Sequence, residues 1–396
     1  MKVSVETKSL LKALKAALLL TKKPSVDALK NCRLIAENNF LNISALYFDS
    51  NVSIAESGVV TCNIKLPCDV YEDGMVLVNC DDLYKFVMSQ KKSKEITIST
   101  SDLKDWSKYA DISAGTLKAT LKQGDPTDYP EFNRFEFNVH DNGVTVQADR
   151  FIKAINRVKG CLSKDSSRQE FCNYFIDVTD NDVCLFATNG HALSVDRLPI
   201  IKYNSLIKFN KTEFGNIEYI NIDPKSLDLV MQMFEDSAYL ELYKKGECFF
   251  ITDYISYVVV KFREEALDYK QFTDMNLGNY HKFSVVRDSL KQAVKNVSAG
   301  VSKINTIGLN FNSDNLKVFT KENFAKYELS DIAGCNPENN FANTNIGVNY
   351  KYLLNAIDKM DDKLYFFVED RYSPMFIYNQ NSSRYLQVVM PMEVPV

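Results

Sequence analysis

The stretch VSVETKSLLKALKAALLL, residues 3–20, decides the fold class, because it joins a short alternating segment to an amphipathic helix. Its first three residues alternate apolar and polar side chains, which predicts a half-buried strand. From Thr7 onward, apolar residues recur at helical spacing and three lysines fall on the opposite face. The same pattern returns with helices beginning near Asp149 and Val286. The sequence therefore predicts a threefold internal repeat.

Each third also contains a second strand that leads directly into a second helix. The residues before these helices can cap a helix N-terminus; they are Asn79, Asp223 and Asn349. An alternating strand follows each helix, at Glu95–Ile98, Tyr239–Leu242 and Leu364–Val368. Six copies of one helix plus antiparallel strands predict an α+β fold, with two helices packed on antiparallel sheets in each domain.

Turn-rich segments indicate where the three domains meet. Residues 122–130 contain two prolines, a glycine and two aspartates, and the stretch from Glu264 to Tyr280 separates the second third from the last. The predicted domains are residues 1–128, 129–264 and 265–396.

The composition is that of an ordinary globular chain. Of its 396 residues, 45% are apolar and 25% are charged, and the formal net charge is −4. A strongly basic chain of the kind typical of nucleic-acid binders is thereby excluded, although a local basic patch is not. No run of 18 apolar residues exists, so we expect no transmembrane helix.

Nine cysteines are scattered along the chain, and no two form a C-x-x-C pair. This pattern favours small buried side chains in a reducing compartment, with a zinc site as the weaker alternative. Lysines at positions 12 and 15 interrupt the apolar run from Leu10 to Leu20, which argues against a secretory signal. We expect a cytoplasmic protein, and an amphipathic transit peptide is the alternative.

Positive charge gathers on the first helix of all three repeats. A run of charge on a helix is usually plain solvated surface. Its recurrence in an acidic chain instead predicts contact with a phosphate backbone that is blind to base sequence. The candidate DNA-binding residues are Lys8, Lys12, Lys15, Lys22, Lys23, Arg150, Lys153, Arg157, Arg287, Lys291 and Lys295.

Three short motifs give the chain a family resemblance. Residues 185–193 read LFATNGHAL, similar to an A-T-D-G-H-R-L segment, and residues 388–392 read VVMPM, similar to a V-V-M-P-M ending. Residues 128–132 read DYPEF, similar to a D-F/Y-P boundary. In this order, the motifs resemble those of the bacterial DNA polymerase III beta subunit family, the sliding clamps. The resemblance is to a divergent member, from a bacterium or a phage.

The resemblance implies three clamp domains per chain and a head-to-tail homodimer closed into a ring. Duplex DNA would thread the hole, and the ring would tether a replicative DNA polymerase. We expect the strand near Gly115 to Lys122 to supply one closing edge. No cofactor, metal or catalytic residue is implied, so we do not expect an enzyme.

The resemblance also implies a pocket that binds short, mostly apolar peptide motifs of the polymerase and the clamp loader. The matching residues are Phe171, Thr188, Gly190, His191, Leu193, Leu227, Pro374, Val388, Met390, Pro391 and Met392. Some of them could instead be plain core residues, and a lone histidine is often structural. Ala192 and Glu393 stand where the family usually or often has arginine, and Asn189 replaces its aspartate. We therefore expect a less basic pocket.

Two other functions stay open at this point. A clamp-like scaffold could bind proteins without retaining DNA. A metal-dependent nuclease is disfavoured, because the sequence contains no nucleotide-binding, nucleophile or paired-carboxylate metal motif.

Overall fold

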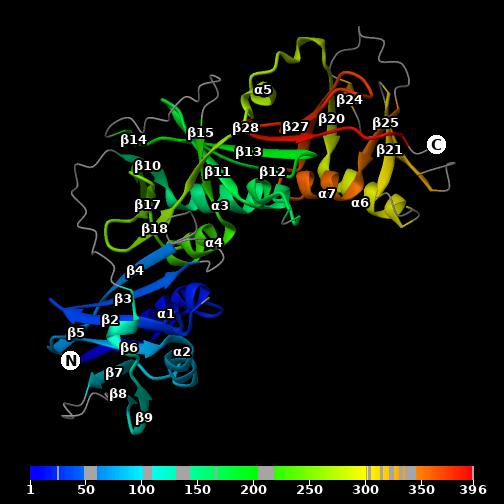
Figure 1. Cartoon of the computed structure of the whole chain (residues 1–396). Coiled ribbons are helices and arrows are strands. Elements are labelled where there is room, and N and C mark those ends of the chain that lie inside the picture. Colours follow the sequence, from blue (N-terminus) through cyan, green and yellow to red (C-terminus); the bar gives the residue numbers. More distant parts are fainter. Residues whose placement is uncertain are drawn as a thin grey trace. The chain divides into compact units, whose positions relative to one another are not determined.

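The computed structural model describes most of the chain, in two compact units (Figure 1). The first comprises Met1–Ile152, Ile200–Lys208 and Ile222–Glu264, and the second comprises Lys153–Pro199, Phe209–Asn221 and Glu265–Val396. The described residues are 1–24, 26–48, 60–100, 109–130, 143–165, 167–203, 218–299, 301, 305–312, 315–320, 325–329, 333–334 and 345–394.

The first unit holds two sheets and three complete helices, α1 (Thr7–Thr21), α2 (Cys80–Ser89) and α4 (Pro224–Met233). The five-stranded sheet has the order β5 (Asp69–Glu72), β1 (Lys2–Glu6), β7 (Glu95–Thr100), β8 (Tyr109–Ala114), β9 (Leu117–Lys122). The nine-stranded sheet runs β14 (Lys202–Tyr203), β10 (Gly143–Gln147), β16 (Tyr239–Lys245), β17 (Cys248–Thr252), β18 (Tyr257–Lys261), β4 (Val60–Pro67), β3 (Phe40–Tyr47), β2 (Asn31–Glu37), β6 (Gly74–Asn79).

Helix α1 owes its position to the apolar stripe found in the sequence. Leu10, Leu14 and Leu20 are fully buried, and the helix packs against α2, α4 and β3. Lys8 and Lys15, on the opposite face, are exposed. The lysine-bearing face of α1 is therefore turned away from the core.

The second unit holds α5 (Lys270–Thr273), α6 (Arg287–Ser298) and α7 (Tyr350–Asp358), and α3 (Ala148–Val158) runs into it from the first. Its ten-stranded sheet has the order β19 (Arg263–Ala266), β15 (Glu218–Ile222), β11 (Tyr174–Val178), β12 (Asp182–Thr188), β13 (Ala192–Pro199), β28 (Ser382–Val389), β27 (Met375–Asn379), β26 (Lys363–Val368), β20 (His281–Val286), β24 (Ala333–Gly334). A four-stranded sheet runs β23 (Lys326–Leu329), β22 (Leu316–Phe319), β21 (Thr306–Phe311), β25 (Asn345–Asn349).

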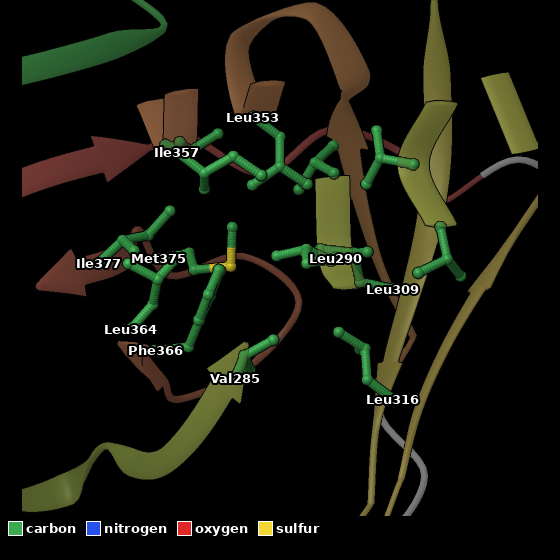
Figure 2. Packing of buried hydrophobic residues seen from close by; sticks show 14 of the residues in the cluster. Val285, Leu290, Leu309, Leu316, Leu353, Ile357, Leu364, Phe366, Met375 and Ile377 are labelled. Carbon is green, nitrogen blue, oxygen red and sulfur yellow. The ribbon is translucent and has the colours of Figure 1, made fainter. Parts of the chain in front are cut away.

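The main core of the second unit forms between its helices and both of its sheets (Figure 2). Leu290 of α6 and Leu353 of α7 meet Phe366 of β26 and Leu309 of β21, and all four are fully buried. Each helix thus buries the apolar stripe that its sequence predicts. The α+β class is confirmed.

The predicted helix starts are also confirmed. The first helices begin at Thr7, Ala148 and Arg287, within one residue of the predicted positions. The second helices begin directly after Asn79, Asp223 and Asn349, and each of these side chains accepts a hydrogen bond from a backbone N–H of the first turn. Local capping chemistry therefore set these boundaries.

One strand pair carries the site described below. Strand β28, from the end of the chain, pairs antiparallel with β13, and Figure 1 draws them side by side in red and green. Ala192 is opposite Val389 at one end of this ladder, and Asp196 is opposite Tyr385 at the other. We call this pairing the β13–β28 seam.

Candidate functional site

A cavity of about 180 Å³ opens at one end of the β13–β28 seam. The β12–β13 turn, the last residues of β28 and the segment around α5 contribute its walls. Its lining residues are Phe171, Thr188, Gly190, His191, Ala192, Leu193, Leu267, Asp268, Tyr269, Gln271, Phe272, Val388 and Met390. Most of these side chains are apolar, so the cavity fits apolar groups of a ligand.

The first wall is the tight turn from Thr188 to Ala192. The Thr188 hydroxyl donates to the Ala192 carbonyl at 2.8 Å and accepts from the Gly190 N–H at 3.1 Å. The Asn189 side chain accepts from the N–H groups of His191 and Ala192, both at 2.9 Å. These bonds hold the turn and direct His191 to the rim.

The turn between β17 and β18 has the same geometry as the turn from Thr188 to Ala192. Thr252 and Asp253 make the same set of hydrogen bonds with Tyr254, Ile255 and Ser256. Tyr254 has a φ of 70°, close to the 82° of Gly190. The positive φ alone therefore does not demand glycine here.

A side chain at position 190 would instead crowd the end of Arg168. A Cβ there would lie 3.1 Å from an Arg168 guanidinium nitrogen, closer than most real contacts. Arg168 itself lies over the Phe171 ring, 4.1 Å from its centre. Gly190 therefore leaves room for a cation beside the cavity.

The second wall comes from β28 and the residue after it. Val388 is directly opposite Leu193 in the seam, and the Met390 N–H donates to the His191 carbonyl at 2.9 Å. The His191 ring stacks on Tyr352 of α7, with ring centres 5.8 Å apart. Residues about 200 positions apart in the chain thus meet at one rim.

The third wall is the segment from Leu267 to Phe272, which sequence reasoning missed. Tyr269 anchors it: its hydroxyl donates to Asp177 at 2.8 Å, and its ring stacks on Phe186 with centres 4.2 Å apart. Lys270 pairs with the same carboxylate at 3.3 Å. Burial raises the pKa of the Tyr269 hydroxyl well above its usual value, so it stays protonated and donates.

Seven of the eleven predicted pocket residues line this cavity: Phe171, Thr188, Gly190, His191, Leu193, Val388 and Met390. The other four do not. Leu227 is fully buried on α4 in the first unit, and Pro374 is half-buried directly before β27. Pro391 and Met392 continue past the cavity, because the Met392 N–H bonds to the Gly347 carbonyl of β25 at 2.8 Å.

The charge of the cavity is low. Among its described lining residues, Asp268 is the one carboxylate and there is no lysine or arginine. Ala192 is buried in the seam and contributes no charge. Arg168 is the cation nearest to the wall at Gly190.

The predicted DNA-binding residues divide into two groups. Seven are exposed and have no ion-pair partner among the described residues: Lys8, Lys15, Lys22, Lys23, Arg150, Lys153 and Lys295. The other four are paired with carboxylates: Lys12, Arg157, Arg287 and Lys291. A paired cation has less charge to offer a phosphate.

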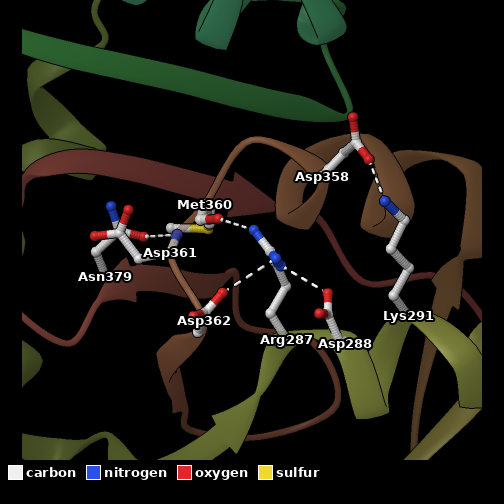
Figure 3. Close-up of polar contacts among 8 residues, drawn as sticks. All are labelled: Arg287, Asp288, Lys291, Asp358, Met360, Asp361, Asp362 and Asn379. Atoms are coloured by element: carbon white, nitrogen blue, oxygen red, sulfur yellow. Dashed lines mark hydrogen bonds and ion pairs between the residues drawn. The ribbon is translucent and has the colours of Figure 1, made fainter.

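Figure 3 shows the pairing on α6. Arg287 reaches Asp288 at 3.0 Å and Asp362 at 3.1 Å, and it also donates to the Met360 carbonyl at 2.6 Å. Lys291 pairs with Asp358 of α7, which lowers the pKa of that carboxyl. In the first unit, Lys12 of α1 pairs with Glu235 at 3.2 Å and with Asp236.

Arg157 corrects the expectation that this face of α3 points to solvent. Its side chain is 15% exposed and pairs with Asp196, which is buried, at 2.9 Å. Its guanidinium carbon lies 4.6 Å from the centre of the Tyr385 ring. Burial raises the pKa of Asp196, and the arginine opposes this shift. Arg157 therefore pairs with a buried carboxylate and does not face solvent as a free cation.

The described residues contain no group of three His, Cys, Asp or Glu side chains placed to hold a metal ion. The eight described cysteines are free thiols, and Cys335 lies outside the described residues. Within the same part of the chain, no helix is long and apolar enough to cross a membrane.

Two parts of the chain match one known protein family. Residues 1–133 match the family described as DNA polymerase III beta subunit, N-terminal domain, and residues 278–393 match its C-terminal domain. The beta sliding clamp of Rickettsia bellii is 25% identical over the full length of both chains. The polymerase III beta of Caulobacter crescentus has a TM-score of 0.80 at 17% identity, and the match covers all of both chains. The sliding clamp of Bartonella birtlesii bound to griselimycin has a TM-score of 0.79 at 18% identity, again over all of both chains.

Proposed function

Because the chain belongs to the DNA polymerase III beta subunit family, we propose that it is a DNA sliding clamp. It encircles duplex DNA without reading its sequence and tethers a replicative polymerase to it. The observation that carries the proposal is the cavity at the seam, because seven residues predicted for partner binding come together there. In this proposal the protein acts in the cytoplasm as a binding protein rather than as an enzyme.

The cavity is the docking site for a short peptide motif of the polymerase and of the clamp loader. Burying one large apolar side chain contributes roughly 1.5–3 kcal/mol. Two or three such anchors, less the cost of ordering the peptide, give an affinity on the order of micromolar. Affinity of this order allows one partner to replace another.

The seven exposed, unpaired cations are the proposed phosphate contacts. They lie on α1, α3 and α6 or directly after α1, the first helices of the three repeats. Contacts with phosphates do not depend on base identity, so they hold the duplex without fixing its register. The ring topology, rather than affinity, then retains the protein on DNA.

The ring is a head-to-tail homodimer of chains with domains 1–128, 129–264 and 265–396. Strand β9 supports this arrangement, because it is the edge of its sheet and its Leu117 is 46% exposed. An exposed edge strand is a ready surface for pairing with a second chain. Contacts of this heterologous kind must close or run on as filaments.

Two measurements on the same sample test the proposal. Light scattering at micromolar concentration should give the mass of a dimer. Protein loaded with its clamp loader should stay on closed circular DNA and slide off after one cut makes that DNA linear. A monomeric mass, or equal release from circular and linear DNA, would contradict the proposal.

A protein scaffold that does not retain DNA is the second candidate. The observation in its favour is that four of the eleven candidate cations are already paired with carboxylates. Equal loss from circular and linear DNA, together with normal peptide binding, would select the scaffold.

A further inference from the structure

Arg157 makes three contacts at the end of the β13–β28 seam that lies away from the cavity. Its Nη1 lies 2.9 Å from an Asp196 carboxylate oxygen. Its guanidinium stacks on the Tyr385 ring at 4.6 Å, and its backbone carbonyl accepts a hydrogen bond from the Tyr385 hydroxyl at 3.1 Å. Asp196 and Tyr385 are directly opposite each other across the seam. One residue therefore holds both strands at the same rung.

Both partners are buried, which makes these contacts costly to lose. Asp196 is 3% exposed and Tyr385 is fully buried. Without Arg157 the buried Asp196 carboxylate loses its ion-pair partner, which favours entry of water or uptake of a proton. Either change would open this end of the seam.

A buried polar chain continues from this rung toward the cavity. The Gln387 side-chain amide, on β28, donates to the Tyr385 hydroxyl and to the Ser194 hydroxyl of β13, both at 2.6 Å. Gln387 is directly opposite Ser194, and the next rung is Leu193 opposite Val388. That rung is part of the cavity wall.

The two strands lie side by side in one sheet and both contribute side chains to the cavity, so its shape depends on their register. Leu193 comes from β13, while Val388 and Met390 come from β28 or directly after it. A shift of one strand against the other would displace these side chains from one another. Protein interiors pack closely enough that a small displacement removes contacts with a ligand.

We propose that Arg157 is a positioning residue for the partner site: it holds the β13–β28 seam closed, and peptide binding requires it although it does not line the cavity. This inference rests on the proposed function, because it assumes that the cavity binds a peptide. It also gives Arg157 a role different from that of its neighbours on α3.

The test compares Arg157→Ala with Lys153→Ala, one helical turn earlier on the same helix. Lys153 is exposed and acts on Asp196 through its charge, but it forms no ion pair or ring contact among the described residues, so it is the matched control. The probe is the fluorescein-labelled pentapeptide Ser-Leu-Ser-Leu-Phe, which carries three apolar anchors, and its binding is measured by anisotropy. Binding of a short labelled duplex is measured on the same proteins over a range of salt concentrations.

Arg157→Ala should raise the Kd of the peptide by about tenfold or more. Lys153→Ala should leave the peptide Kd within about twofold and lower the salt slope of DNA binding by about 0.9. Arg157→Ala should leave that slope unchanged. Arg157→Lys keeps the charge for Asp196 but loses the planar stack on Tyr385, so it should weaken peptide binding by about threefold, less than Arg157→Ala.

Loss of stability alone is separated by a core variant, Val297→Ala, which removes buried volume from α6. It should lower the melting temperature and leave peptide binding unchanged. If Arg157→Ala does not fold, Arg157→Lys decides: about a threefold loss of affinity supports the inference, and wild-type affinity overturns it.

The inference is overturned if wild-type protein binds the peptide and Arg157→Ala binds it equally well. It is also overturned if Arg157→Ala lowers the DNA salt slope and spares the peptide. Absence of peptide binding by the wild-type protein is a different result, since it removes the proposed partner site itself.

Discussion

The division of basic residues into paired and unpaired groups predicts which of them bind DNA. The double change Lys15→Gln with Lys295→Gln removes one exposed, unpaired cation from α1 and one from α6. Each cation that neutralises a phosphate contributes about −0.9 to the slope of log affinity against log salt. The slope should therefore become less steep by about 1.8 for each protomer in contact with DNA.

The size of this change is easily measured. Between 50 and 200 mM salt, a difference of about 1.8 in slope changes the loss of affinity by about twelvefold. The assay is the anisotropy of a fluorescent 30-base-pair duplex, titrated at several salt concentrations. Stability should change little, because both side chains point away from the core.

A charge-neutral control separates direct contact from the overall field of the protein. Lys12→Gln with Asp236→Asn removes a cation of α1 together with a carboxylate that forms no other ion pair among the described residues. The net charge is unchanged, so we expect the slope to stay within about 0.3 of the wild type. A slope that drops as far in this variant as in the first would refute the division. No drop in the first variant would refute the proposed phosphate contacts.

Three further predictions concern other parts of the chain. Deleting Met390–Val396 removes one wall of the cavity, so it should abolish polymerase stimulation by rings pre-closed on circular DNA, while full stimulation would rule out the pocket. Leu353→Ala, at a fully buried site on α7, should lower the free energy of unfolding by about 2–5 kcal/mol in a denaturant titration. Lys291 lowers the pKa of Asp358 in the folded state below its ordinary 3.8. The pair therefore stabilises the fold above pH 3.8, and this stabilisation is lost as the pH falls through the folded-state pKa. In Lys291→Gln, the pKa of Asp358 measured by NMR titration should move back up.

Helix positions were predictable because the signals that set them are local. The apolar stripe of α1 and the capping side chain of Asn79 each act within one or two turns of the chain. The turn at Thr188–Ala192 is equally local, since its hydrogen bonds join neighbouring residues. A single sequence contains all of this information.

Ion pairs and cavity walls depend on residues far apart in the chain, and sequence reasoning failed there. Lys12 finds Asp236 across 224 positions, and Arg157 finds Asp196 across 39. Helical periodicity places both cations on a polar face but cannot reveal a carboxylate opposite them. The wall around α5 was missed for another reason, because four helical residues are too few to show a period.

The negative net charge of the chain is compatible with DNA binding once the pairs are taken into account. Four candidate cations are compensated by carboxylates on their own unit, which leaves seven that face solvent without a partner among the described residues. If all seven met phosphates at once, the salt slope of one protomer would be about −6. A protein that must slide gains nothing from a steeper slope, because each added contact has to break at every step. On the proposed function, the pairing of Lys12, Arg287 and Lys291 limits the hold on DNA while keeping the helix surface polar, and ring closure retains the protein.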